Sequence, residues 1–279
     1  MKALVTGCAG FIGSALARRL LELGAEVVGV DRFSPYYAVE TKRRNVQLLA
    51  TDRRFQLVEA DLSDLTASDL LEGCDYVFHE AGQAGVRSSW GSEFETYLRD
   101  NVLATQRLLE AAIQAPRLRK FVFASSSSVY GDAETYPTRE DLVPRPVSPY
   151  GVTKLAAEQL CRLYARNFGV PTVSLRYFTV YGPGQRPDMG FHRFIRAMLR
   201  DEPITIYGDG EQTRDVTFID DIVAANLLAA ERGQPGDVYN VGGGHQVTVN
   251  QVLHELELVL GWVPRVRHVS EQKGDVRDT

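Results

Sequence analysis

The first 31 residues alternate between short apolar strands and a glycine turn, and this pattern narrowly limits how the chain can fold. A strand leads into a turn in which Gly7, Gly10 and Gly13 are spaced G-x-x-G-x-x-G. An amphipathic helix follows, and a second strand ends at Asp31. This order predicts a parallel βαβ unit. Glycines at such a turn let the backbone approach a pyrophosphate, which the N-terminus of the next helix then faces. We therefore expect a dinucleotide site.

The end of the second strand indicates which dinucleotide binds. Asp31 lies 18 residues after Gly13, where a carboxylate can bond the ribose hydroxyls of adenosine and repels a 2′-phosphate. We therefore predict NAD rather than NADP. Arg32, beside it, is a candidate to stack on the adenine or to attract a phosphate. Asp61, after the third strand, has two interpretations: contact with the adenine, or a helix N-cap together with the polar residues that follow it.

The alternation of strands and helices continues along the chain. Apolar segments at 55–59, 76–79, 120–124 and 172–176 have the character of further strands, and 94–115 of a long amphipathic helix. We predict an α/β fold with a doubly wound parallel sheet. Ligands in such folds bind beyond the carboxyl ends of the strands.

A smaller α/β lobe is predicted to be interleaved with this sheet. After residue 178 loops and short elements replace the regular alternation, and no linker or repeat separates the two parts. We predict that residues 1–178 form the cofactor-binding domain and that 215–242 return to its sheet. Residues 179–214 and 243–279 are predicted to form the substrate-binding lobe.

Composition excludes several classes of function. The 279 residues carry a net charge of −5 without a basic block, so we expect no nucleic acid and no anionic membrane as partner. No apolar run is long enough to span a bilayer, and the N-terminus lacks the features of a signal peptide. The three cysteines are scattered, which is typical of reduced thiols in a cytoplasm. No Cys/His cluster has metal-ligand spacing, so we expect no metal.

One tyrosine and one lysine have the spacing of a catalytic pair. Tyr150 and Lys154 lie four residues apart at the start of a predicted helix, which places the phenol and the ammonium on one face. A nearby cation is expected to lower the pKa of the phenol, so that Tyr150 can act as a general base. Lys154 would also bond the nicotinamide ribose, and Ser126 could relay the proton of a substrate alcohol. On its own the pair is also typical of a solvated helix face.

These segments together resemble the extended short-chain dehydrogenase/reductase family of nucleotide-sugar epimerases and dehydratases. The resemblance rests on the glycine turn, Asp31, the serines at 125–128 with Val-Tyr-Gly after them, and the Tyr150/Lys154 pair. It covers essentially the whole chain and implies a Rossmann sheet with bound NAD. The predicted NAD contacts are Gly7, Gly10, Phe11, Ile12, Gly13, Asp31, Arg32, Asp61, Leu62, Ala81, Gly82, Gln83, Asn101, Ser125, Tyr150, Lys154 and Tyr177.

Within this family, three segments most resemble UDP-glucuronate 4-epimerases: 81–87, 176–183 and 186–189. A guanidinium matches phosphate oxygens, so Arg186 and Arg214 are candidate ligands of the UDP diphosphate. Both also have a structural interpretation as ion-pair residues, Arg214 through Asp215. The full set of predicted substrate contacts is Arg87, Ser126, Ser127, Ser128, Tyr150, Thr179, Arg186, Arg214 and, by resemblance, Gln272 and Asp275.

The residues beside the catalytic pair distinguish the members of the family. Related dehydratases carry Asp-Glu at the positions of Ser127 and Ser128, and related decarboxylases carry a glutamate at Ser128. UDP-galactose 4-epimerases usually carry asparagine at Thr179. Three hydroxyls here are suited to holding a sugar carboxylate, so that the 4-keto intermediate keeps its CO₂. The alternative is that these side chains only cap strand ends.

The predicted activity is NAD-dependent C4 epimerisation of UDP-glucuronate to UDP-galacturonate. Alternatives are a UDP-glucose or UDP-N-acetylhexosamine 4-epimerase, a UDP-glucuronate decarboxylase and a non-catalytic NAD-sensing protein. The last class tends to lose the Tyr/Lys pair. The resemblance also implies a homodimer built on the helices at 94–115 and 151–167. Relatives usually continue for a few tens of residues past the position of Thr279.

Overall fold

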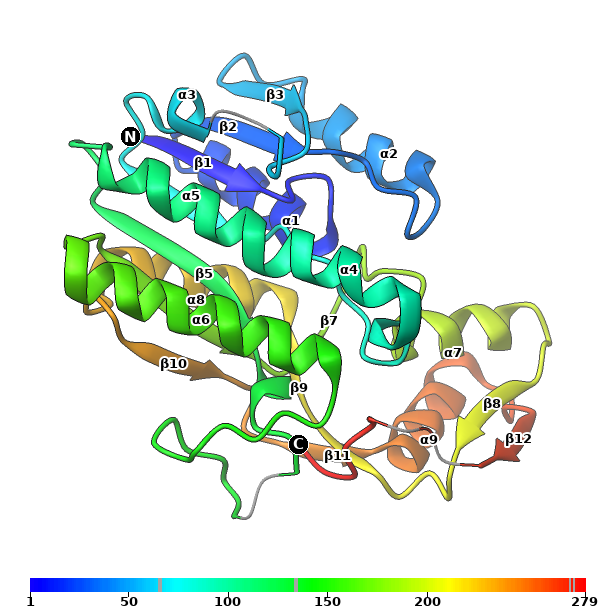
Figure 1. The fold of residues 1–279 in the computed structure, drawn as a ribbon. Helices are drawn as coiled ribbons and strands as arrows, with labels where there is room; N and C mark the ends of the chain where they lie inside the picture. The colour runs from blue at the N-terminus through cyan, green and yellow to red at the C-terminus, as the bar shows by residue number, and fades with distance from the viewer. Residues whose placement is uncertain (65–66, 133–134, 271, 273) are drawn as a thin grey trace.

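The computed structural model describes residues 1–64, 67–132, 135–270, 272 and 274–279. Its centre is a sheet of seven strands in the order β10-β6-β5-β4-β1-β2-β3 (Figure 1). All neighbouring strands run parallel. The order of the strands therefore reverses between β1 and β4, which is the switch point where ligands bind in such sheets. The strands are β1 (Lys2–Thr6), β2 (Glu26–Asp31), β3 (Phe55–Glu59), β4 (Tyr76–His79), β5 (Lys120–Ser126), β6 (Thr172–Tyr177) and β10 (Val238–Val241).

Helices cover both faces of this sheet, as the doubly wound prediction required (Figure 1). One face carries α1, α2 and α8, and the other carries α3, α5 and α6. Each layer encloses its own apolar core against the sheet, which is why central strands such as β6 are buried along their whole length. The helices are α1 (Phe11–Glu22), α2 (Val39–Leu49), α3 (Ala67–Leu71), α5 (Ala104–Ile113), α6 (Pro149–Phe168) and α8 (Ile219–Arg232).

The helix predicted at 94–115 is interrupted. It consists of α4 (Phe94–Tyr97), a π-helical segment η3 (Leu98–Leu103) and α5. A π-helical turn holds an extra residue and changes the direction in which the following side chains point. Asn101 lies within this segment and is almost completely buried. Apolar periodicity alone does not reveal such an interruption.

The second half of the chain forms two small sheets and a core of its own. One sheet has the order β11-β9-β7, and the other pairs β12 with β8. Met198, Ile204, Ile206 and Leu253 form the small core between β8 and the helices α7 and α9. The elements are β7 (Thr179–Tyr181), α7 (Gly190–Leu199), β8 (Ile204–Tyr207), β9 (Thr213–Phe218), β11 (Gln246–Thr248), α9 (Val249–Leu260) and β12 (Val266–Val269).

The chain returns to the main sheet between these elements. α8 packs against α1, and β10 pairs with β6 from Val238 opposite Ser174 to Val241 opposite Tyr177. The predicted α/β fold with a doubly wound parallel sheet is confirmed. The division into two lobes at the stated boundaries stays a prediction.

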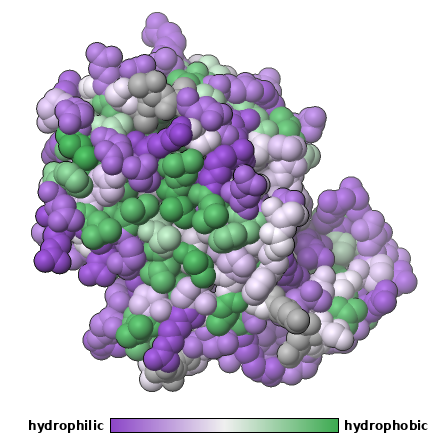
Figure 2. Space-filling model, in the orientation of Figure 1, coloured by the Kyte–Doolittle hydropathy of each residue, from purple (hydrophilic) through white to green (hydrophobic). Residues whose placement is uncertain are grey.

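One face of the molecule exposes apolar side chains over α5 and α6 (Figure 2). Leu98 and Leu103 of η3 are exposed there, as are Val152 and Leu163 of α6. Among the described residues, no helix is both long and apolar enough to cross a membrane.

Candidate active site

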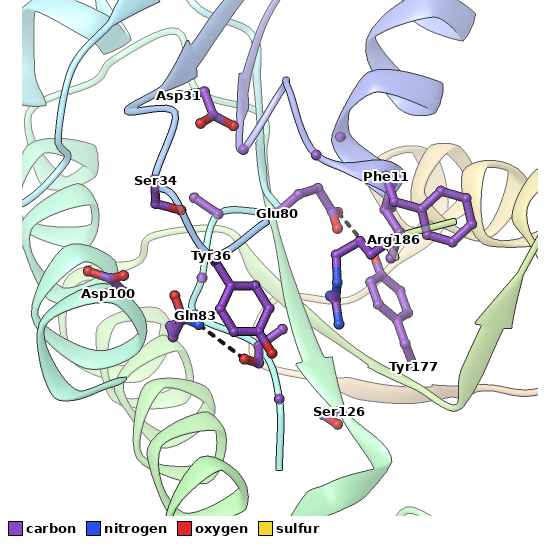
Figure 3. A pocket seen from close by; sticks show the side chains of 18 of the residues that line it. Phe11, Asp31, Ser34, Tyr36, Glu80, Gln83, Asp100, Ser126, Tyr177 and Arg186 are labelled. Atoms are coloured by element: carbon purple, nitrogen blue, oxygen red, sulfur yellow. Dashed lines mark hydrogen bonds between the residues drawn. The ribbon is translucent and has the colours of Figure 1, made fainter. Parts of the chain in front are cut away.

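A cavity of about 420 Å³ lies at the carboxyl ends of the central strands (Figure 3). Its wall comes from the glycine turn after β1, the loop after β2, the segment after β4, the serines after β5 and the residues after β6. All of the predicted NAD contacts line it except Asn101 and Lys154. Residues separated by up to 182 positions in the sequence thus surround one space, as Gly7 and Met189 do.

The glycine turn leaves no room for side chains. Gly7 has φ +69°, and a Cβ there would lie 2.8 Å from the backbone nitrogen of Ala81. A Cβ on Gly13 would lie 2.2 Å from the carbonyl oxygen of Gly7. The turn therefore packs directly against the N-terminus of α1, whose first residues line the cavity together with Asp31. This arrangement fits the pyrophosphate of a dinucleotide.

Acidic groups surround the adenosine end of this cavity. Asp31 accepts hydrogen bonds from the backbone amides of Ala9 (3.2 Å) and Phe33 (2.7 Å). Arg32 forms ion pairs with Asp61 (2.7 Å) and Asp100 (2.5 Å). Its guanidinium is therefore already neutralised, which weakens its predicted role as a ligand for a 2′-phosphate. These surroundings favour NAD over NADP.

Asp61 lines the cavity and also binds the residues that follow it. It lines the cavity, and its carboxylate also accepts hydrogen bonds from the amide (2.9 Å) and the hydroxyl (2.7 Å) of Ser63. Burial opposes ionisation of this carboxyl, but the bonds from Arg32 and Ser63 prevail and lower its pKa to about 2. Among the described residues, Asp61 thus caps the turn at 62–64 that precedes α3.

The helix α6 places the catalytic pair. Ser148 caps it by accepting a hydrogen bond from the amide of Gly151 (3.1 Å), and Pro149 occupies its first turn. Tyr150 therefore points into the cavity from the first turn, while Lys154, one turn later, lies behind the wall. The Nζ of Lys154 donates to the carbonyl oxygen of Ala124 at 2.7 Å.

The expected direction of the Tyr150 pKa shift is wrong for the protein as described. Burial of the phenol raises the pKa of Tyr150, and this outweighs the hydrogen bond to Ser126 and the charge of Arg186, which lower it. Lys154 is not among the described groups that shift the pKa of Tyr150, and its ammonium donates to Ala124 instead. Burial also lowers the pKa of Lys154 to about 8, against the attraction of Glu80.

Asn101 supports the site from behind. Its Oδ1 accepts a hydrogen bond from the amide of Gln83 (2.7 Å), and its Nδ2 donates to the carbonyl of Gln83 (3.1 Å) and to Oγ1 of Thr153 (3.0 Å). A Cβ on Gly82 would lie 2.8 Å from Asn101 Oδ1. The structure thus places Asn101 between the segment after β4 and α6, outside the cavity for which it was predicted.

The three hydroxyls beside Tyr150 are unpaired. Ser127, Ser128 and Thr179 line the cavity, and none of their side-chain oxygens takes part in a hydrogen bond among the described residues. Ser126 differs, because its Oγ also accepts a hydrogen bond from the amide of Ser128 (3.1 Å) and caps a short 3₁₀ turn. Strand-end capping therefore explains Ser126 in part, but not the other three.

A second cavity of about 650 Å³ adjoins the first on the side of the smaller lobe. Arg87, Thr179, Arg214, Gln272 and Asp275 line it. It therefore collects the predicted nucleotide contacts that the first cavity lacks.

The arginines of the second cavity have defined partners. Arg87 forms an ion pair with Asp275 (2.6 Å), and its guanidinium stacks on the ring of Tyr207 at 3.9 Å. Arg214 donates to the carbonyls of Val276 and Arg277, both at 2.9 Å, rather than to Asp215. The proposed ion pair of Arg214 with Asp215 is therefore absent among the described residues, since Asp215 accepts hydrogen bonds from two glycine amides.

Arg186 lies in the first cavity close to its border with the second. It forms a two-point ion pair with Asp188, with both distances 3.0 Å. Tyr36, which lines both cavities, lies near Asp188 and projects into the same space as Arg186 and Tyr177 (Figure 3). The structural interpretation of Arg186 as an ion-pair residue thus holds, although its guanidinium still faces the cavity.

Sequence reasoning missed several cavity residues. Tyr36 and Lys42 belong to the loop and helix after β2, where no motif drew attention. Glu80 lies in a segment that was interpreted through its small residues and their backbone contacts. Its position directly after a buried strand, where parallel strands place their ligands, was the available signal.

The comparisons with known proteins agree with this geometry. A profile of the "NAD dependent epimerase/dehydratase family" matches residues 3–242. The chain is 45% identical over 94% of its length to an uncharacterized UDP-glucose epimerase, YtcB, of Bacillus subtilis, covering 83% of that protein. It is 37% identical to a UDP-glucuronate 4-epimerase of Thermodesulfobacterium geofontis, over 99% of this chain and 86% of that one.

A solved structure is equally similar. The UDP-glucuronic acid 4-epimerase of Bacillus cereus, in complex with UDP-glucuronic acid and NAD, is 45% identical and superimposes with a TM-score of 0.97. The match covers 100% of this chain and 89% of that one. The resemblance inferred from the sequence is thereby confirmed, and this chain belongs to the NAD dependent epimerase/dehydratase family.

Proposed function

We propose that this protein is a NAD-dependent 4-epimerase that interconverts UDP-glucuronate and UDP-galacturonate through a 4-keto intermediate. The observation that carries the proposal is the group of three hydroxyls beside Tyr150, on Ser127, Ser128 and Thr179, which have no hydrogen-bond partner within the described part of the chain. The similarity to UDP-glucuronate 4-epimerases supports it.

Tyr150 is the residue that moves the proton. Its phenolate removes the proton from O4 with the help of Ser126, and the phenol returns a proton after the sugar has turned in the cavity. Bound NAD supplies a reversible acceptor for the C4 hydride, so that the overall reaction has no net redox change. We assign Lys154 to bonding the nicotinamide ribose and to stabilising the phenolate that forms during the reaction. Its ammonium donates to Ala124 and has to turn toward Tyr150 for the second role.

The hydroxyls protect the intermediate. Oxidation of C4 turns a glucuronate into a β-keto acid, which loses CO₂ fastest when the bond between C5 and the carboxylate lies along the ketone π orbitals. Fixed donors on Ser127, Ser128 and Thr179 hold the carboxylate away from that alignment. Positions 127 and 128 hold serines instead of the carboxylate residues that related dehydratases and decarboxylases carry there. This supports epimerisation over dehydration or decarboxylation.

The diphosphate must anchor the substrate while the sugar turns. Arg214 lines the second cavity and lacks a carboxylate partner among the described residues, so its charge is available. Arg87 and Asp275 form a pair that a ribose or phosphate can enter, and Gln272 lines the same cavity. Arg186 faces the border between the two cavities.

A second candidate is a 4-epimerase of a neutral UDP-hexose. The similarity to the Bacillus subtilis protein named as a UDP-glucose epimerase favours it. Incubation with UDP-glucuronate and, separately, UDP-glucose, with the products identified by NMR, distinguishes the two. UDP-galacturonate as a product supports the UDP-glucuronate 4-epimerase, and UDP-galactose alone supports the UDP-hexose 4-epimerase. A pentose nucleotide would indicate a decarboxylase.

We further propose a cytoplasmic homodimer that buries the apolar surface over α5 and α6. Leu98 and Leu103 of η3 and Val152 and Leu163 of α6 are exposed, and Figure 2 shows apolar side chains over α5 and α6. Such a surface suits a two-fold interface of four helices. The three cysteines are buried and unpaired, which suits a reducing compartment.

A further inference from the structure

Glu80 is a partly buried acidic group for which the proposed reaction has no role. It follows β4 directly and lines the first cavity. Tyr177 donates a hydrogen bond to its Oε1 at 3.0 Å (Figure 3). Its Oε2 has no hydrogen-bond partner among the described residues and is not one of their buried unsatisfied atoms. That oxygen is therefore open to the cavity.

The surrounding hydrogen bonds require Glu80 to be an acceptor. The Nδ2 of Asn226 donates to the carbonyl of Ile222 (2.9 Å), which fixes the orientation of the amide because a carbonyl can only accept. The same Nδ2 donates to the hydroxyl of Tyr177 at 2.7 Å. Tyr177 has one proton, which is therefore directed at Glu80. Accepting this bond favours the carboxylate form of Glu80.

Glu80 lies at the reacting end of the cavity. Tyr177 is opposite Ser126 in the pairing of β5 with β6, and Ser126 is bonded to Tyr150. The other end of the cavity is marked by Asp31. A dinucleotide with its adenosine at Asp31 therefore has its nicotinamide beside Glu80.

Few of the described charged groups act on the Glu80 carboxylate. The described group of opposite sign that acts on Glu80 is Lys154 of α6, and Tyr177 of β6 is the group bonded to it. Lys154 directs its Nζ at Ala124, so it is not hydrogen-bonded to Glu80. The carboxylate is thus incompletely neutralised and faces a space in which a cation would gain the most from it.

We propose that Glu80 is the counter-ion of the oxidised nicotinamide ring and makes the protein bind NAD⁺ in preference to NADH. The inference rests on the proposed function. Hydride transfer from C4 of the sugar reduces the ring and removes its positive charge, while the O4 proton passes to Tyr150. Glu80 then has no positive charge opposite it. The free energy of the complex with NADH is therefore raised relative to that of the complex with NAD⁺. The consequence is that hydride returns to the sugar readily and the resting protein keeps its cofactor oxidised.

The decisive variant is Glu80→Gln. A glutamine keeps an oxygen that can accept the bond from Tyr177 but removes the charge. The control is Asp31→Asn, which changes the adenosine end, where NAD⁺ and NADH are identical. Holoenzyme is equilibrated with mixtures of NAD⁺ and NADH of known ratio and freed of unbound nucleotide. The two bound forms are then measured after denaturation.

We expect Glu80→Gln to shift the bound ratio toward NADH by about tenfold, which is ~30 mV for a two-electron couple. Asp31→Asn is expected to leave the ratio unchanged while weakening both forms. An unchanged ratio in Glu80→Gln would overturn the role of Glu80 and leave the epimerase proposal intact. Failure of the wild-type protein to bind either nucleotide would overturn both.

A measurement on the unmodified protein covers the case in which Glu80→Gln does not fold. Burial raises the pKa of Glu80 to about 7, against the bond from Tyr177 and the charge of Lys154. The Glu80 carboxyl therefore becomes neutral as the pH decreases from 7.5 to 5.5. The wild-type preference for NAD⁺ over NADH is expected to fall with it, by ~tenfold between the fully charged and the fully neutral carboxyl. Lys154, with its pKa lowered to about 8, is mostly charged already at pH 7.5 and gains little charge below it. A preference that does not change with pH over this interval would contradict the proposal.

Discussion

Glu158 and Arg176 form a two-point ion pair beneath the serines of the active site, with Nη2 to Oε1 at 2.6 Å and Nε to Oε2 at 3.0 Å. Both side chains are buried. Glu158 lies one helical turn after Lys154, and its carboxylate also accepts a hydrogen bond from Ser125 at 2.7 Å. The pair therefore ties α6 to β5 and β6 at the point where these elements present the catalytic side chains.

Removal of one partner of this pair is expected to destabilise the protein strongly. Glu158→Ala leaves the guanidinium of Arg176 buried without a counter-charge, which costs about 3–5 kcal/mol. Urea unfolding followed by circular dichroism measures this. The double variant with Arg176→Met is expected to recover part of the loss, because no charge is then left unpaired. A single variant as stable as wild type would show that the pair does not hold these elements together.

Tyr150→Phe is expected to reduce turnover by about 10²–10⁴-fold, because the general base is lost. The ring still fills its place against Tyr97, with which it makes an edge contact. The amount of NAD bound per chain should therefore remain at the wild-type level. Steady-state rates and nucleotide extraction test the two parts separately, and a fully active variant would refute the assigned role.

Thr179→Ala is expected to increase the share of decarboxylated product at the cost of epimerised product. The variant removes one of the hydroxyls that hold the carboxylate, a loss worth about 1 kcal/mol or several-fold in the product ratio. NMR integration of UDP-galacturonate against the pentose nucleotide measures it. Thr205→Ala, in the second cavity, removes a hydroxyl away from the serines and should leave the ratio unchanged. Equal ratios in both variants would rule out this role for Thr179.

Asp31→Ser is expected to weaken the discrimination between NAD and NADP by about tenfold or more, since ~1.4 kcal/mol corresponds to that factor. Three carboxylates surround the adenosine end in the wild type, and the guanidinium of Arg32 is bound by two of them. Removing the charge at Asp31 lessens the repulsion of a 2′-phosphate. Affinities measured by calorimetry for both nucleotides provide the comparison. An unaltered ratio would place selectivity elsewhere.

Leu163→Glu is expected to convert a dimer into a monomer, because it places a charge on the exposed apolar face of α6. Leu48→Glu, on the exposed side of α2, is the matched control and should not change the association state. Equilibrium sedimentation of the wild type and both variants decides the matter. A monomeric wild type would reject the proposed interface.

Most of the central sheet could be predicted from the sequence because its signals are local. The strand from Lys2 to Thr6 and the glycines after it determine a βαβ unit almost by themselves. The helix α2 was missed because its face toward the core holds few apolar residues. The strands β7, β9 and β11 were missed because each is short or polar and is specified by pairing with distant partners.

The parts of the site that escaped prediction depend on neighbours that lie far away in the sequence. The pKa of Tyr150 follows from burial by elements that the Tyr-x-x-x-Lys spacing does not describe. The role of Glu80 depends on Tyr177 and Asn226, which are distant in the chain. Arg214 could be recognised as a cation, but not as a donor to the carbonyls of the last residues.

The most direct test of the central claim follows the hydrogen at C4. UDP-glucuronate labelled with deuterium at C4 is incubated with the protein, and the product is examined by ¹H and ²H NMR. The account predicts UDP-galacturonate that keeps the label at C4, because hydride leaves and returns within one closed site. Loss of the label to solvent, or no conversion of UDP-glucuronate at all, would contradict it.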